Sequence, residues 1–157
     1  MKLSPVQLLE SHPIKVCVEY NSKLTVDESA ENEEVELAIE HMTHIERIGE
    51  EDLSGDKAKY PTYVLVLGIR SGDETTTNPY SFEIVVTGLF SIDPDALLTG
   101  TSVDDMATQY GFSMLYGQIR DILMSISGRM KSGLFVLPTM SFMDAKFPVK
   151  ALGGSAS

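Results

Sequence analysis

Apolar and polar residues alternate along the first half of the chain, and this alternation predicts β-strands. Residues 14–21 have one apolar and one polar side, as expected for a half-buried strand. Residues 34–45 repeat the same period after an acidic connection, and their polar side is strongly acidic. The apolar side of the first strand consists of Ile14, Val16, Val18 and Tyr20.

Two more strands are predicted before residue 93. Thr62–Arg70 is rich in Val, Leu and Tyr on both sides, which is typical of an interior strand. The preceding residues, 46–61, are expected to form a mobile loop. The fourth strand is predicted over Tyr80–Ile92. No connection up to this point is long and helical enough for a parallel crossover, so we expect the four strands to be antiparallel.

The apolar period then changes to three and four residues, which predicts one long helix over about residues 103–127. Ser102 is a typical N-cap residue, and acidic residues follow in the first turn. Gly128 and Gly133 are expected to end the helix, and Pro138 prevents its simple resumption. The apolar stripe consists of Leu115, Ile119, Ile122, Leu123, Ile126 and Met130.

A second face of this helix carries small, weakly polar side chains, which suit close packing better than free solvation. Burying both helix faces requires more than one four-stranded sheet, so a closed symmetric assembly is expected. The predicted state is a homotetramer built as a dimer of dimers. The expected interface residues are Ser113, Gly117, Asp121 and Met124.

Gly88 lies inside the fourth predicted strand, where a glycine weakens the strand. A β-bulge or the close approach of another backbone explains such a position. We expect the long helix to be the element that approaches Gly88.

Composition limits the classes of function. A chain of 157 residues is most simply one domain, here predicted over residues 1–150 with a flexible tail over 151–157. The net charge of -11 disfavours nucleic acid and favours basic partners, although it also serves solubility. Cys17 is the sole cysteine, so no intrachain disulfide can form. No apolar stretch is long enough to span a bilayer or resembles a secretory signal, and the expected location is cytoplasmic.

Nothing in the sequence predicts catalysis, a cofactor or a metal site. His41 and His44 fall on opposite sides of the second strand, and His12 is expected in an N-terminal loop. The carboxylate run at residues 50–52 is best explained as a solvated loop. We therefore expect a binding protein and not an enzyme.

Three segments together resemble the SecB family of protein-export chaperones, over about residues 8–145. These are the strand that ends Gly88-Leu89-Phe90-Ser91-Ile92, the helix that carries Leu115-Tyr116 and Arg120-Asp121, and the segment that runs from Leu137-Pro138 to Phe142-Met143-Asp144. The resemblance implies a four-stranded antiparallel sheet packed with a long helix. It also implies a dimer of dimers that holds unfolded precursor chains without ATP and delivers them to the export motor SecA.

In the family, acidic side chains on the exposed sheet face bind the motor. Glu19 and Glu83 occupy matching positions here, whereas Lys15 stands where another acid is expected. The second helix is short or missing, the tail is not acidic, and the final spacing is Pro-x-x-x-Phe. These departures favour an alternative, a SecB-like chaperone dedicated to one partner such as an antitoxin.

Apolar burial supplies the energy for binding a non-native chain in either case. We expect the binding groove to lie between the helix and the sheet. The second half of the chain is also rich in methionine, whose flexible side chain adapts to varied partners. Core packing is the alternative for each candidate lining residue: Phe90, Tyr110, Phe112, Phe135, Met140 and Phe142.

Overall fold

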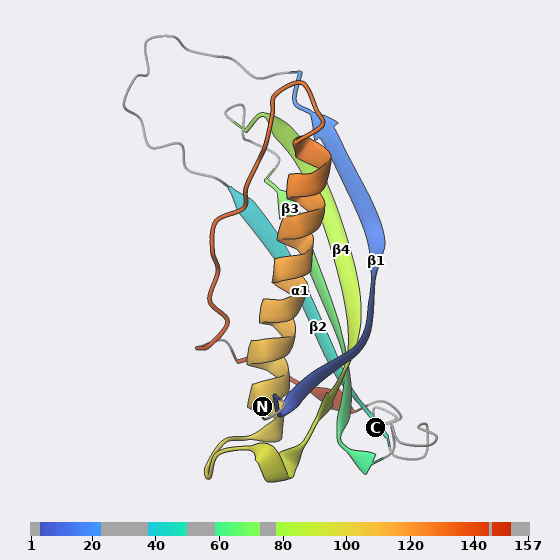
Figure 1. Ribbon diagram of the computed structural model, residues 1–157, viewed down its shortest axis with the longest axis vertical. Helices are drawn as coiled ribbons and strands as arrows, with labels where there is room; N and C mark the ends of the chain where they lie inside the picture. The colour runs from blue at the N-terminus through green and yellow to red at the C-terminus, as the bar shows by residue number, and fades with distance from the viewer. Residues whose placement is uncertain (1–3, 23–37, 50–58, 73–77, 145, 152–157) are drawn as a thin grey trace.

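The computed structural model describes residues 4–22, 38–49, 59–72, 78–144 and 146–151 (Figure 1). Its strands form one sheet in the order β1-β4-β3-β2-β5, in which β1, β4, β3 and β2 pair antiparallel with one another. The two-residue strand β5 pairs in parallel with β2. The predicted four-stranded antiparallel sheet with one long helix is therefore confirmed. The elements are β1 (Val6–Tyr20), β2 (Ile39–Ile48), β3 (Thr62–Ser71), β4 (Tyr80–Ile92), α1 (Val103–Ser127) and β5 (Lys150–Ala151).

Helix α1 lies along one face of the sheet, mainly over β3 and β4 (Figure 1). The two strands alternate between side chains that pack under the helix and side chains on the other sheet face, here called the outer face. Leu65 and Leu67 of β3 and Ile84 and Phe90 of β4 are fully buried under α1. From the helix, Leu115, Ile119 and Leu123 complete this core.

Several predicted boundaries need correction. β1 begins at Val6, so His12 lies in a strand and not in an N-terminal loop. β2 continues to Ile48, which removes residues 46–48 from the predicted loop, and residues 50–58 lie outside the described residues. Ala151 was expected to begin a flexible tail, but it belongs to β5 and pairs with Arg47 of β2. Helix α1 starts directly after Ser102 as predicted, but the Ser102 side chain makes no capping hydrogen bond.

The edge strand β1 contains two irregularities in its pairing with β4, between Leu8 and Glu10 and between Pro13 and Lys15. Each leaves one extra residue, Leu9 or Ile14, without a direct partner on β4. Pro13 cannot donate a backbone hydrogen bond, and it is tolerated here because edge strands do not need every donor. Bulges and proline both limit indiscriminate pairing at a sheet edge.

Gly88 of β4 is buried under α1. A Cβ atom at this position would lie 2.7 Å from Cε2 of Phe90 and 2.9 Å from Cδ2 of Leu115. Gly111, on the facing side of α1, is equally constrained, because its Cβ would lie 2.5 Å from Cδ2 of Leu65. The helix lies against Gly88 as expected, but the contact is made by the Leu115 side chain and not by the helix backbone.

After α1 the chain turns at Gly133, which has a φ of 77°, and runs back along the helix on the side of β2 (Figure 1). We call residues 133–144 the strap. The strap contains neither α-helix nor strand, and no second α-helix occurs among the described residues. It places Leu137 and Phe142 in the core beside the helix.

Candidate functional site

Exposed apolar side chains gather at the N-terminal end of α1. Leu98, in the connection before the helix, is 83% exposed, and Tyr110 and Met143 are also exposed. These side chains surround a hollow of about 410 Å³, here called the apolar hollow. Its remaining lining residues are Pro5, Ala96, Leu97, Thr101, Met106 and Gln109. An accessible, methionine-containing apolar cavity is suited to binding apolar side chains of varied shape.

The predicted groove residues are placed very differently from one another. Tyr110 lines the apolar hollow and is 39% exposed. Phe90 is fully buried under α1, and Phe112 is fully buried against Phe142 and Phe147, so neither can line an open groove in this conformation. The other three belong to the strap: Phe142 is buried, and Phe135 and Met140 are partly buried against the core. The space between α1 and β2 is therefore filled by the chain's own strap.

The strap is held by side chains of α1 and β4. Tyr116 donates a hydrogen bond from its hydroxyl to the carbonyl oxygen of Pro138 at 2.5 Å, and the Tyr80 hydroxyl donates to the Gly133 carbonyl oxygen at 2.6 Å. The Phe135 amide donates to Oγ of Ser127 at 2.9 Å. Burial raises the pKa of Tyr116 above its usual value, against an opposing effect of Arg120, so the hydroxyl remains a donor.

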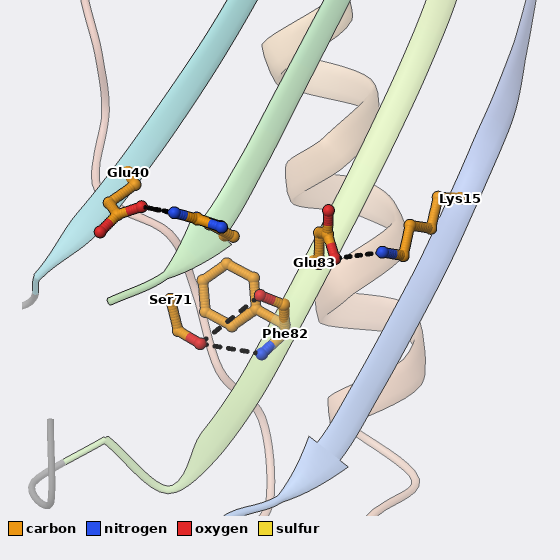
Figure 2. A network of polar contacts seen from close by, with 6 residues as sticks. Lys15, Glu40, Ser71, Phe82 and Glu83 are labelled. Carbon is orange, nitrogen blue, oxygen red and sulfur yellow. Dashed lines mark hydrogen bonds and ion pairs between the residues drawn. The ribbon is translucent and has the colours of Figure 1, made fainter. Parts of the chain in front are cut away.

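The outer face of the sheet carries a row of alternating charges (Figure 2). Lys15 of β1 forms an ion pair with Glu83 of β4, and Arg70 of β3 forms one with Glu40 of β2. Glu83 and Arg70 are direct cross-strand neighbours, so the four charges cross the sheet as plus, minus, plus, minus. Glu19 is exposed on the same face. Glu83, which was predicted to contact the motor, therefore has a cation on each side, Lys15 and Arg70.

A second hollow, of about 290 Å³, lies beside this row. Gly68 contributes no side chain to it, while Met42 and Val85 form its apolar walls. Met42 is 54% exposed although it is a large apolar residue. An apolar depression rimmed by ion pairs has the anatomy of a small protein-binding surface.

The four predicted interface residues lie on the part of α1 that faces away from the sheet. Ser113 and Asp121 are exposed, and Gly117 and Met124 are partly exposed. A Cβ atom at Gly117 would meet nothing within 4 Å, so this face is open in the single chain. The assignment of this face to an oligomer interface stays a prediction.

The sequence pattern predicted Ile14, Val16 and Tyr20 on the apolar side of a half-buried strand, but all three are exposed, so β1 was missed as an apolar surface. Five of its large apolar residues are exposed, and among the described residues only β4 pairs with it. These residues are Leu8, Leu9, Ile14, Val16 and Tyr20. The adjacent Leu8 and Leu9 were the available signal, because two neighbouring apolar residues break the alternation expected of a half-buried strand.

The described residues contain no cluster of three or more histidine, cysteine or acidic side chains able to hold a metal ion. His41 and His44 do point to opposite faces, because they pair with Ile69 and Val66 on β3. His44 contacts Glu46 on its own strand, with 2.8 Å between Nε2 and Oε1.

In the described part of the chain, no helix is both long enough and apolar enough to cross a membrane.

Two of the solved structures that resemble this chain cover most of its length. A SecB-like chaperone from Mycobacterium tuberculosis, in complex with a peptide from the HigA1 antitoxin, has a TM-score of 0.47 and 14% identity over 87% of this chain and 91% of that one. A protein of unknown function from Streptococcus agalactiae has a TM-score of 0.48 and 12% identity over 85% of this chain and 97% of that one. No protein-family profile matches the sequence, and no curated protein shows significant similarity to it.

Proposed function

We propose that this protein is an ATP-independent chaperone that binds non-native polypeptide through apolar surface. The observation that carries the proposal is the apolar hollow, where Leu98, Tyr110 and Met143 remain exposed around an open cavity. Exposed apolar groups gathered around a concavity are unusual in a surface that contacts only water. The sequence resemblance to export chaperones supports the same conclusion independently of the hollow.

Aggregation of a chemically denatured, unrelated protein, diluted into buffer without nucleotide, tests this function. We expect the wild-type protein to suppress light scattering and Leu98→Asp to weaken that suppression several-fold. Leu98 is so exposed that this change leaves the core intact. Thr99→Asp is the matched control, because it adds the same charge at the neighbouring exposed position outside the hollow. Failure of the wild type at several-fold molar excess would overturn the proposal.

In the general form of this function, the clients are precursors for Sec-dependent export and the receiving partner is SecA. The acidic groups Glu19 and Glu83 on the outer face would contact that motor, as the resemblance implies. This form of the function requires a cytoplasmic location, with no nucleic acid, cofactor or catalysis involved. Direct binding of purified SecA, with and without an unfolded client, tests this step.

A chaperone dedicated to one partner, such as an antitoxin, is the second candidate. Two structural observations favour it: the acidic face is partly neutralised by Lys15 and Arg70, and the described residues contain no second α-helix. Affinity purification from the source cell separates the two candidates. A broad spectrum of precursors supports the general chaperone, and one dominant partner supports the dedicated one.

We propose that the working unit is a homotetramer, a dimer of dimers. Two open surfaces support this assembly: the edge of β1 with its exposed apolar residues, and the face of α1 around Gly117. A sheet edge can pair with the same edge of a second copy, and a helix face of small residues can pack against its own copy.

A further inference from the structure

The strap occupies the groove in which sequence analysis expected a client chain. It is an extended segment whose side chains at positions 135, 137 and 142 turn inward. Phe135 packs against Tyr80 and Phe82, with ring centroids 6.0 and 5.8 Å apart. Phe142 packs between Phe112 and Tyr116, with centroid distances of 6.0 and 5.9 Å. An apolar chain held in extended form is also what a chaperone of this kind would bind.

The strap also separates the apolar hollow from this buried groove. Met143 forms part of the wall of the hollow, whereas the adjacent Phe142 is 3% exposed and fills the groove. If residues 139–144 moved away from α1, the hollow would extend toward the side of Phe112 that Phe142 covers, while Phe147 would still pack on the same ring at 5.0 Å. The accessible and buried apolar surfaces would then form one continuous site.

The attachment of the strap differs from that of every strand of the sheet. Between described residues, strap positions 134–144 form no backbone-to-backbone hydrogen bond. Side chains provide the attachment, through the bonds from Tyr116 to Pro138 and from Phe135 to Ser127. The strap can therefore detach without breaking the sheet ladder or the contacts of α1 with β3 and β4. Leu134 and Val136 on its outward side are exposed, so part of its apolar surface is not buried even when it is attached.

We propose that the strap is a built-in occupant of the client groove, which an extended polypeptide displaces when it binds. This inference rests on the proposed chaperone function and specifies its ligand. The ligand is an extended segment with large apolar side chains at relative positions 1, 3 and 8, matching Phe135, Leu137 and Phe142. The strap and the client therefore compete for the groove. Molecules in which the strap is attached cannot bind the client, and this lowers the apparent affinity for the client.

The test uses a fluorescent peptide with the strap's own sequence, residues 134–143, and measures its binding to the full chain by anisotropy. In the protein, Thr139→Gly with Ser141→Gly loosens the strap at two exposed positions that do not line the groove. Two added glycines favour the detached strap, and we expect the peptide to bind about tenfold more tightly. Ser81→Gly is the control, since it places a glycine on the outer face of β4 and should leave the peptide affinity unchanged.

A second peptide, with alanine in place of Phe135, Leu137 and Phe142, should bind neither protein. Hydrogen exchange should show that the intact peptide speeds exchange of the protein's own strap amides. Equal peptide affinity for the loosened and wild-type proteins, equal binding of the alanine peptide, or no binding at millimolar peptide would overturn the inference. Suppression of aggregation by the wild type would survive any of these results, so the failure of this inference and of the chaperone function can be told apart.

Discussion

Lys15 on the edge strand β1 forms an ion pair with Glu83 on β4, on the face of the sheet opposite the helix (Figure 2). The two side chains are 53% and 40% exposed, so water screens the pair and its contribution to stability is small. The ion pair matters more for recognition, because a partner that approaches Glu83 also meets the positive charge of Lys15.

Removing this cation should therefore strengthen docking of a basic partner. We expect Lys15→Ala to raise the affinity for purified SecA at low salt, and Glu83→Lys to lower it. Both effects should shrink as ionic strength rises. The unfolding free energy should change by less than about 1 kcal/mol in either variant, because the pair is exposed.

Calorimetric titration at two salt concentrations measures both affinities, and denaturant unfolding measures stability. Ser81→Lys tests Glu19 in the same assay, because position 81 pairs directly with Glu19 on β1 and the added cation should likewise lower the affinity. If Glu83→Lys binds SecA like the wild type at low salt, Glu83 has no part in docking.

Gly117→Leu should disrupt the proposed tetramer without unfolding the single chain. Nothing lies within 4 Å of a Cβ at this position, so the added side chain enters open space in the protomer. Between two helices packed through this face, the same side chain would act as a wedge. Sedimentation velocity should shift from tetramers toward dimers, while the thermal midpoint of the isolated protomer stays the same or rises. A wild-type protein that sediments as a monomer at micromolar concentration would contradict the assembly itself.

Gly88→Ala should destabilise the fold by about 1–3 kcal/mol, as overpacked core positions do. The new methyl group would overlap the ring of Phe90 and the side chain of Leu115, which are both fully buried. Gly68→Ala is the matched control on the outer face of β3. There the nearest atom is the flexible end of Met42, at 3.3 Å, and we expect a change near zero. Urea unfolding of both variants gives the comparison, and equal losses would show that helix approach is not the reason for Gly88.

Alkaline pH should reveal the bond between Tyr63 on β3 and Asp104 in the first turn of α1, where the hydroxyl donates to Oδ1 at 2.5 Å. Burial raises the pKa of Tyr63, and the hydrogen bond and the charge of Asp104 raise it further. The folded protein thus holds this proton more tightly than the unfolded chain. The resulting stability is fully present below the unfolded pKa of about 10 and is lost as pH rises above it.

We therefore expect the stability difference between wild type and Tyr63→Phe to shrink from pH 8 toward about pH 11. Asp104→Asn should reduce this dependence, because it removes the charge that holds the proton. Urea unfolding across this pH range measures both variants. A wild type whose advantage over Tyr63→Phe does not change with pH would contradict the prediction.

Local periodicity explains what the sequence predicted correctly. The alternation in Tyr80–Ile92 and the three-and-four spacing in Val103–Ser127 each depend on the geometry of a single element, and both elements have their predicted bounds. The role of Gly88 could be predicted for the same reason, because a glycine inside an apolar strand indicates a bulge or a close neighbour. The antiparallel arrangement followed from the short connections between the strands.

Tertiary structure alone decided which apolar residues are accessible. Phe112 and Tyr110 lie two residues apart on one helix, yet one is fully buried and the other lines the open hollow. The difference arises because the strap and the sheet cover one side of α1 and leave the other side open. Likewise, no spacing in the sequence pairs Lys15 with Glu83, 68 residues away. The sequence by itself determined the main elements and the buried side of α1, because periodicity is local, whereas the exposure of β1, the groove, its occupant and the charge row depend on contacts between residues far apart in the chain.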